Sequence, residues 1–130
     1  MFKEVTINTK NNEEIVDITE KVERLVKESN LNEGICTIFV KHTTASIIIN
    51  ENWDPSVGKD LLELLEEIAP KHKAYSHNDG NAHSHLKSAI LGTSVTIPIL
   101  NNELQLGRWQ DIFLIEFDGP KERKIIVQIK

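Results

Sequence analysis

Histidine has the widest chemical range of the residue types in this sequence, and three of the five histidines, His77, His83 and His85, fall within nine residues. Imidazole transfers protons near neutral pH and binds zinc and similar divalent ions. On a strand, His83 and His85 would share one face and form a two-point metal ligand. On a helix each residue advances about 100°, so the two rings would lie about 160° apart. Helical periodicity after Asn81 favours the helix, with His85 beside the buried stripe as the site residue and His83 on the surface.

The segment from His42 to Ser46 is a second candidate, because it supplies one imidazole and three hydroxyls beside a tight turn. Hydroxyls and free backbone N–H groups at such a turn suit a phosphate or a carboxylate. The alternative is an ordinary strand connection in which Thr43 and Thr44 serve β propensity. The histidines have a similar alternative, as satisfied or solvated side chains. The sequence has no glycine-rich phosphate loop, no G-x-S-x-G and no H-E-x-x-H, which disfavours a P-loop hydrolase, an α/β-hydrolase and a zincin.

Two further residues near the end of the chain have more than one interpretation. Trp109 can stack on a heteroaromatic ring, although a tryptophan is more often part of a core or an interface. Glu116 alternates onto the same strand face as Ile112 and Leu114. An acid on an apolar face must be paired, solvated or buried at a subunit contact.

The composition describes one compact domain, because 130 residues with 39% apolar residues can fold without disulfides or metal. Any bound metal should therefore serve function. A formal net charge of −5 disfavours nucleic acid or an anionic membrane as partner, since both require a basic footprint. No apolar run approaches the roughly 20 residues that cross a bilayer, and the start does not resemble a secretory signal. The single Cys36, in an apolar context, indicates a buried thiol and a reducing, cytoplasmic compartment.

Period-two alternation predicts strands at residues 2–7 and 14–18, joined as a hairpin that turns at residues 10–12. β-branched residues predict two adjacent strands, Ile35 to Lys41 and Ser46 to Asn50. The short link between them predicts a second hairpin that turns near Thr43 and Thr44.

Three helices are expected from caps and apolar stripes. Thr19 can cap the first, which ends before Gly34. Asp54 caps the second, with Pro55 at its first position, and Asn81 can cap the third, which stops at Gly92. The expected buried stripes are Val57, Leu61, Leu64, Leu65 and Ile68 on the second helix and Ala82, Leu86, Ala89 and Ile90 on the third.

Three more strands are expected at about residues 94–100, 109–117 and 123–129, with turns at Asn101-Asn102 and Asp118-Gly119-Pro120. The expected fold class is therefore α+β. It has a single domain over residues 1–130 and a mostly antiparallel sheet system, a β-sandwich or barrel-like sheet with about three helices, in which hairpins are the main connection.

Taken in series, short motifs from about residue 35 to the C-terminus resemble the YjbQ family, the group named secondary thiamine-phosphate synthase. Several motifs in the right order are far more specific than any single one. They are His42-Thr43-Thr44-Ala45-Ser46, Asn50-Glu51-Asn52, Asp54-Pro55, Tyr75-x-His77, Ser84-His85-Leu86-Lys87-Ser88, Leu91-Gly92-Thr93-Ser94, Gly107-x-Trp109-Gln110 and Asp118-Gly119-Pro120.

The resemblance implies a compact α+β domain that assembles as a homotrimer and has weak or secondary thiamine-phosphate synthase activity. That reaction joins a pyrimidine pyrophosphate to a thiazole phosphate and releases pyrophosphate. His42, His77 and His85 fall on the family's histidine positions and are the expected ligands of a divalent metal ion, zinc or similar by ligand type and magnesium by the family's reaction. The expected catalytic residues are His42, Glu51 and His85, and the expected substrate-binding residues are Thr43, Thr44, Ser46, Ser88 and Trp109.

Two residues depart from the family pattern. Arg108 stands where a small polar residue is common before Trp-Gln, and Lys121 stands where arginine usually follows Asp-Gly-Pro. Lysine keeps the charge but lacks the bidentate fork, so a phosphate contact there would be looser. The alternative function is a non-catalytic oligomeric module that binds a small phosphorylated or metal ligand.

The predicted hairpin separates His42 from Glu51 by roughly 15 to 20 Å within one chain, at about 3.3 Å per strand residue. If both act on one small ligand, a neighbouring subunit must supply one of them.

Overall fold

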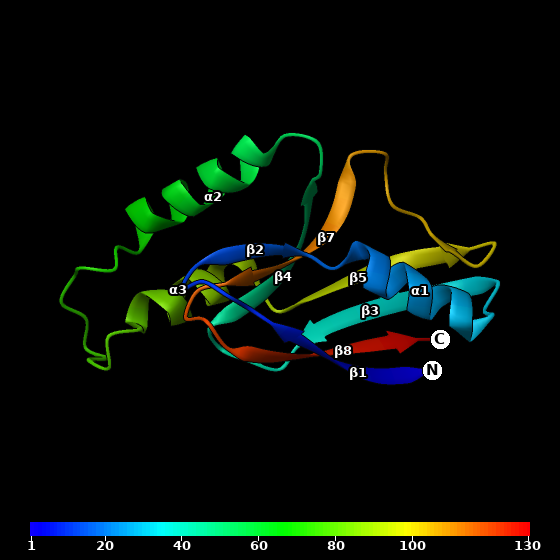
Figure 1. Ribbon diagram of the computed structural model, residues 1–130, viewed down its shortest axis with the longest axis horizontal. Helices are drawn as coiled ribbons and strands as arrows, with labels where there is room; N and C mark the ends of the chain where they lie inside the picture. Colours follow the sequence, from blue (N-terminus) through cyan, green and yellow to red (C-terminus); the bar gives the residue numbers. More distant parts are fainter.

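The computed structural model describes residues 1–130 as eight strands and three helices (Figure 1). The strands are β1 (Phe2–Asn8), β2 (Glu14–Asp17), β3 (Glu33–Val40), β4 (Ala45–Glu51), β5 (Ser94–Leu100), β6 (Glu103–Leu104), β7 (Gln110–Glu116) and β8 (Glu122–Ile129). The helices are α1 (Thr19–Ser29), α2 (Pro55–Ile68) and α3 (Ala82–Leu91).

The strands form two curled antiparallel sheets. One has the order β1-β8-β3-β5-β6 and the other the order β2-β7-β4. Their inner faces and α1 share one cluster of 16 buried apolar residues. On the other side of the small sheet, Leu65 of α2 forms a second cluster with Ile115 and Phe117. The predicted fold class, a single α+β domain with a barrel-like antiparallel sheet system, is confirmed.

The two predicted hairpins are wrong. β1 pairs with β8, and β2 pairs with β7 in the other sheet. β3 pairs with β5 and β8, whereas β4 pairs with β7. Alternation reports which face of a strand is buried but not which strand lies beside it, so the strands could be found without their partners. The only neighbouring strands that are also consecutive in the chain are β5 and β6, which turn at Asn101 and Asn102, both with positive φ.

Three links between strands cross from one sheet to the other at the same corner of the molecule. The amide of Thr9 donates to the carbonyl of Lys121 over 2.9 Å, and the amide of Gly119 donates to the carbonyl of Asn12 over 3.0 Å. The amide of Phe117 donates to the carbonyl of Thr44 over 3.1 Å. The corner therefore brings the β1–β2, β3–β4 and β7–β8 links into contact, and α3 packs beside them on β4.

The caps behave differently from one another. Asp54 caps α2, since its Oδ1 accepts from the amide of Ser56 over 2.9 Å. Asn81 directly precedes α3, but its side chain makes no capping bond. Thr19 lies inside α1, and its amide donates to Asp17 Oδ1 over 2.9 Å, so the predicted Thr19 cap is wrong.

Of the predicted buried stripe of α3 only Ala82 is buried, and the rest of the buried face is polar. His83, Ser84, Lys87 and Ser88 are buried, whereas Leu86 and Ile90 are about half exposed. The polar face is buried because hydroxyls and charges bond it to its neighbours. Ser84 Oγ donates to the carbonyl of Phe117 over 2.6 Å, and Ser88 Oγ donates to the carbonyl of Ala45 over 2.6 Å. The predicted burial of His83 and His85 is reversed, because His83 is buried and His85 is partly exposed.

The only cysteine, Cys36, is fully buried, as predicted, and burial raises the pKa of its thiol to about 11. No helix of this structure has both the length and the apolar character to span a membrane.

Candidate functional site

The sheet corner holds a cavity of about 370 Å³ with no apolar residue in its lining. We call it the corner pocket. Three of its residues are cations and one is an acid, although the whole chain carries a net charge of −5. Each cation is paired with a carboxylate: Lys41 with Glu4, Lys121 with Asp118 and Arg123 with Glu116. The lining residues are Lys41, His42, Thr43, Thr44, Asn81, His85, Asp118, Lys121 and Arg123. A cavity of this composition suits an anion.

A buried ion pair forms the floor of the corner pocket. Arg123 and Glu116 are 2% and 0% exposed, and the guanidinium donates to both carboxylate oxygens. Arg123 Nη2 also donates to the carbonyl and the hydroxyl of Thr44, over 3.0 and 2.8 Å. The structure gives Arg123 Nη1 no protein partner, which leaves this nitrogen as the donor available to a ligand in the pocket.

Glu116 holds that arginine in place. Its Oε1 accepts from the hydroxyl of Thr9 over 2.7 Å, and its Oε2 accepts from the amide of Asp118 over 3.0 Å. Burial raises the pKa of Glu116, but the hydrogen bonds from Arg123, Thr9 and Asp118 outweigh it and leave the pKa below its ordinary value. Of the three interpretations that the sequence allowed for Glu116, the structure shows the paired one.

His42 follows the end of β3, just beyond the last pair that β3 forms with β8, Val40 with Ile125. Its Nε2 accepts a hydrogen bond of 2.8 Å from the amide of Lys124. Burial lowers the pKa of His42, and Arg123, Lys121 and Lys41 lower it further, whereas Glu116 opposes them. His42 is therefore a neutral imidazole at pH 7.

A chain of hydrogen bonds leads out of the corner pocket to His77. Lys121 Nζ and Asn81 Nδ2 both donate to Asp118 Oδ2, over 2.6 and 3.0 Å. His77 Nε2 lies 2.9 Å from Asn81 Oδ1. Burial raises the pKa of Asp118, but the bonds from Asn81 and Lys121 outweigh it, so the carboxyl group is ionised at neutral pH.

His77 and His85 contact each other edge to face, with ring centroids 5.1 Å apart. They line a second, mostly apolar cavity of about 350 Å³, which we call the side pocket, together with Tyr75, Ser76, Ala82 and Leu86. His85 lines both pockets and joins them. The three predicted metal ligands are thus distributed over two adjoining cavities, and their binding of a metal stays a prediction.

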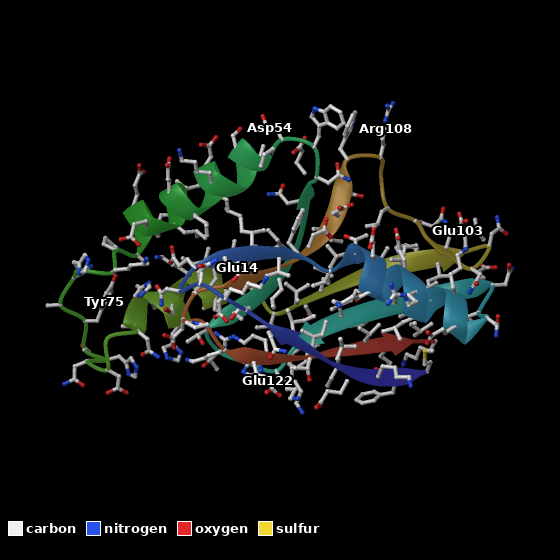
Figure 2. The ribbon with its side chains drawn as sticks, viewed as in Figure 1. Glu14, Asp54, Tyr75, Glu103, Arg108 and Glu122 are labelled. Carbon is white, nitrogen blue, oxygen red and sulfur yellow. The ribbon has the colours of Figure 1, made fainter.

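Glu51 and Trp109, two of the predicted site residues, lie at the end of the β4–β7 pair that is farther from the corner pocket. β4 begins at Ala45, opposite Glu116, and ends at Glu51, opposite Gln110, a run of about 20 Å at 3.3 Å per residue. Glu51 Oε2 accepts from the amides of Trp53 and Asp54 over 3.1 and 2.9 Å and so shapes the entry to α2. Figure 2 shows Asp54 and Arg108 both along the upper edge of the molecule, with Tyr75 at the far left.

Trp109 also belongs to this distant end. Its ring meets that of Trp53 edge to face with centroids 5.7 Å apart, and the guanidinium of Arg108 lies 4.8 Å from its centre. Within one chain Trp109 therefore lies far from the corner pocket.

The four predicted hydroxyl residues divide into two pairs. Thr43 and Thr44 line the corner pocket, and the Thr44 hydroxyl is engaged by Arg123. Ser46 and Ser88 are fully buried between β4 and α3, where Ser46 Oγ donates to the carbonyl of Ser88 over 3.1 Å. Neither serine lines the corner pocket or the side pocket. Their position indicates a structural role, and the predicted contact with substrate stays a prediction.

A second cluster of ionisable groups lies on the other side of α3. Glu13, Glu66 and His83 place possible metal-ligand atoms within 4.8 Å of one another. The buried ammonium group of Lys87 stands among them, 3.0 Å from Glu13, 2.7 Å from Glu66 and 3.1 Å from His83 Nδ1. Lysine thus supplies the positive charge there. The cluster ties α2, α3 and the β1–β2 link together.

Sequence reasoning missed Lys41, Asn81, Asp118 and Arg123 as pocket residues and included Lys121 only as a departure from a family pattern. The signal for Arg123 is present in the alternation of β8, where Arg123 shares its face with Ile125, Val127 and Ile129. A charge on that face requires a buried partner, and Glu116 on β7 is the matching irregularity.

The fold and the corner pocket define a class of protein: an antiparallel α+β half-barrel with a cationic polar cavity at the corner of its two sheets. The chain belongs to the YjbQ/UPF0047 family, because the family model described as "UPF0047 protein YjbQ-like" matches residues 3–130.

Relatives extend over nearly the whole chain. The UPF0047 protein MJ1081 of Methanocaldococcus jannaschii is 44% identical over 99% of this chain and 94% of its own length. YugU of Bacillus subtilis is 40% identical over 99% of this chain and 98% of its own length.

Two solved structures superimpose with TM-scores of 0.95. The YugU ortholog of Clostridium acetobutylicum is 44% identical, with 98% of this chain and 99% of that chain covered. A YbjQ-like protein of unknown function from Sulfolobus solfataricus is 40% identical, with 99% and 95% covered. These comparisons show the family and the fold.

Proposed function

We propose that this protein binds a small phosphorylated molecule in the corner pocket and acts as a weak or secondary thiamine-phosphate synthase. The observation that carries the proposal is the concentration of Lys41, Lys121 and Arg123 around one cavity of an acidic protein. Phosphate and pyrophosphate groups are the small anions that such a set of donors fits.

The side pocket supports a substrate with a ring. Its lining is mostly apolar and includes Tyr75 and Leu86, and it meets the corner pocket at His85. A phosphate ester of a heteroaromatic alcohol can therefore place its phosphate among the cations and its ring beside Tyr75. Both substrates of the proposed reaction, a pyrimidine pyrophosphate and a thiazole phosphate, belong to that class.

The corner pocket supplies the electrostatic part of the reaction. A bond to pyrophosphate breaks while a bond to the thiazole forms, and negative charge collects on the leaving group. Arg123, held in place by Glu116, stabilises that charge without reorganising, and the half-exposed Lys121 adds a second cation. His85 lines both pockets and its ring has no hydrogen-bond partner in the protein, so with no metal ion on it the ring can give a proton to an oxygen of the departing pyrophosphate.

The donor set partly fits a divalent metal. His77 and His85 lie in contact, and imidazole nitrogens favour zinc or a similar ion, whereas magnesium prefers oxygen ligands such as Asp118. With His42, these are the predicted ligands. A bound ion would polarise phosphate oxygens and neutralise charge on the leaving group.

Assembly as a homotrimer completes the proposal. Leu86 and Ile90 of α3 and Leu64 and Ile68 of α2 are each about half exposed, although each belongs to an apolar stripe. Such faces are typical of subunit contacts. Because Leu86 also lines the side pocket, a neighbouring chain on this face would border the site.

Subunit mixing tests whether Glu51 takes part. We expect His42→Ala and Glu51→Gln proteins, mixed after reversible dissociation, to regain activity at mixed interfaces if the two residues act together from different chains. No recovery despite demonstrated exchange would remove Glu51 from the site, since the two residues are far apart within one chain.

The main experiment measures turnover and binding separately. Untagged protein is analysed for metal and then assayed with both thiamine precursors, while inorganic pyrophosphate binding is measured by calorimetry. Lys121→Met should weaken pyrophosphate binding several-fold, and the matched control Lys59→Met, at the other end of the molecule, should not. Tight binding without turnover, after metal is supplied, would favour the non-catalytic module instead.

A further inference from the structure

The hydrogen bonds around His42 and His77 fix which nitrogen of each ring carries its proton. A neutral imidazole has one N–H donor and one bare nitrogen with a lone pair. A nitrogen that accepts a hydrogen bond is bare, so the other nitrogen must carry the proton. The two histidines differ in this respect.

His42 receives its bond from a group that can only donate. The amide of Lys124 points at His42 Nε2 over 2.8 Å, at the position where β3 has left β8 and no strand carbonyl is available. Nε2 is therefore the bare nitrogen, and Nδ1 carries the proton. The structure gives Nδ1 no partner in the protein, and His42 lines the corner pocket.

His77 bonds to the side chain of Asn81, and Asp118 on the other side of Asn81 fixes how that amide is oriented. Asp118 is an ionised carboxylate that only accepts, so the Asn81 atom that faces it is the NH₂ group. The atom of Asn81 that faces His77 is then the carbonyl oxygen, 2.9 Å from His77 Nε2. Nε2 must carry the proton, and Asp79 Oδ2, 3.6 Å from the same nitrogen, is a second acceptor for it. In the neutral ring Nδ1 of His77 is therefore bare.

We infer that the family-position histidines divide their work, with His42 donating its Nδ1–H to the bound phosphate while His77 keeps a lone pair on Nδ1 for a metal ion beside the adjacent His85. This inference rests on the proposed function and refines it, because it removes His42 from the predicted metal ligands. A metal on His42 Nδ1 would require loss of the ring's last proton, and a metal on Nε2 would break the bond from Lys124. Lys41, Lys121 and Arg123 line the same cavity, which supports an anion as the partner of His42.

The first test reads the tautomers directly. Long-range ¹H–¹⁵N NMR spectra of the ligand-free protein at pH 7.5 should show His42 protonated at Nδ1 and His77 protonated at Nε2, with assignments from His42→Gln and His77→Gln. Each ring is the internal control for the other. A neutral His42 protonated at Nε2 would overturn the inference.

The second test separates phosphate binding from metal binding. A hydrogen bond to a charged group contributes roughly a tenfold to hundredfold change in affinity. His42→Ala should weaken binding of inorganic pyrophosphate to the metal-free protein by about tenfold or more and leave zinc affinity within about twofold. His77→Ala should do the reverse. Zinc affinity that falls as far in His42→Ala as in His77→Ala would overturn the inference.

His42→Gln guards against a trivial loss of fold. Its amide can accept from the Lys124 N–H and also donate, so this variant should recover much of the pyrophosphate affinity that His42→Ala loses. If His42→Ala and His42→Gln weaken pyrophosphate equally while both remain folded, His42 does not donate to the anion. If the unmodified protein binds no pyrophosphate, the proposed function fails, and the division between His42 and His77 then stands or falls on the tautomers and the zinc affinities.

Discussion

The two ends of the β4–β7 pair show how differently one pair of strands can be used. At one end, Ala45 pairs with Glu116 beside the corner pocket, where Glu116 and Arg123 are buried and bonded to each other. At the other end, Glu51 pairs with Gln110, and Trp53 and Trp109 are 75% and 47% exposed. Burial is what distinguishes them. Arg123 at the corner is buried and fixed by Glu116, so it can act on a ligand without reorganising, whereas the aromatic rings of Trp53 and Trp109 at the far end are hydrated.

The largest expected effect comes from breaking the buried ion pair. Glu116→Gln should reduce the free energy of unfolding by about 3–5 kcal/mol, because it leaves the guanidinium of Arg123 buried without its counter-ion. Pyrophosphate binding should fall with it. Urea unfolding measures the loss, and Glu51→Gln at the other end of β4 is the matched control, with an expected change below about 1 kcal/mol. Equal effects at the two ends would contradict the comparison.

A somewhat smaller effect is expected at the cluster on the far side of α3. Lys87→Met should cost about 2–4 kcal/mol, because Glu13, Glu66 and His83 then lose their shared buried cation and keep only the more exposed Lys71, 3.5 Å from Glu13. Thermal unfolding checks this. Cobalt absorption spectra give a second readout, since the vacated Glu13, Glu66 and His83 should bind the ion in the variant only. A variant as stable as the parent would remove Lys87 from the attachment of α3.

Acid should weaken the same cluster. Burial lowers the pKa of His83, and Lys87 and Lys71 lower it further, whereas Glu13 and Glu66 oppose them. The unfolded chain then binds a proton more readily than the folded one, so stability is fully present above the ordinary histidine pKa of about 6.5 and falls as the pH drops below it. The slope from one histidine is at most about 1.4 kcal/mol per pH unit. Urea midpoints between pH 5 and 8 should show this decline, and His83→Gln should flatten it.

The sequence predicts local structure well and long-range pairing poorly. Asp54 with Pro55 marks the start of α2 because capping is a local interaction. The partners of β1 and β3 are not predictable from alternation, since β8 and β5 lie far along the chain. The burial of the polar face of α3 is not predictable from the sequence for the same reason. It depends on bonds to Phe117, Ala45 and Glu13, which lie in other parts of the chain and leave no trace in the periodicity of the helix.

The candidate site divides along the same line. Short motifs in the sequence predict His42, Thr43, Thr44 and His85 as site residues, and all four line the corner pocket. Arg123 and Glu116 are each an isolated irregularity on an apolar strand face, and only the pairing of the sheets at the corner brings them together. Glu51 and Trp109 belong to equally clear motifs, and yet the length of β4 separates them from the pocket.

The smallest expected effect is at the exposed tryptophans, and it tests whether the far end matters to the site at all. An edge-to-face aromatic pair contributes about 0.5–1.5 kcal/mol, and hydration of both rings places this pair at the low end of that range. Trp53→Ala should therefore change the free energy of unfolding by less than about 1 kcal/mol and leave pyrophosphate affinity unchanged, and Trp109→Ala should behave alike. If Trp109→Ala instead weakens binding of a thiazole phosphate while Trp53→Ala does not, Trp109 stacks on the substrate ring. Because it lies about 20 Å from the corner pocket of its own chain, it would have to reach the pocket of a neighbour. Light scattering on the same two variants then distinguishes a lost ring contact, which leaves the assembly intact, from a lost subunit contact, which does not.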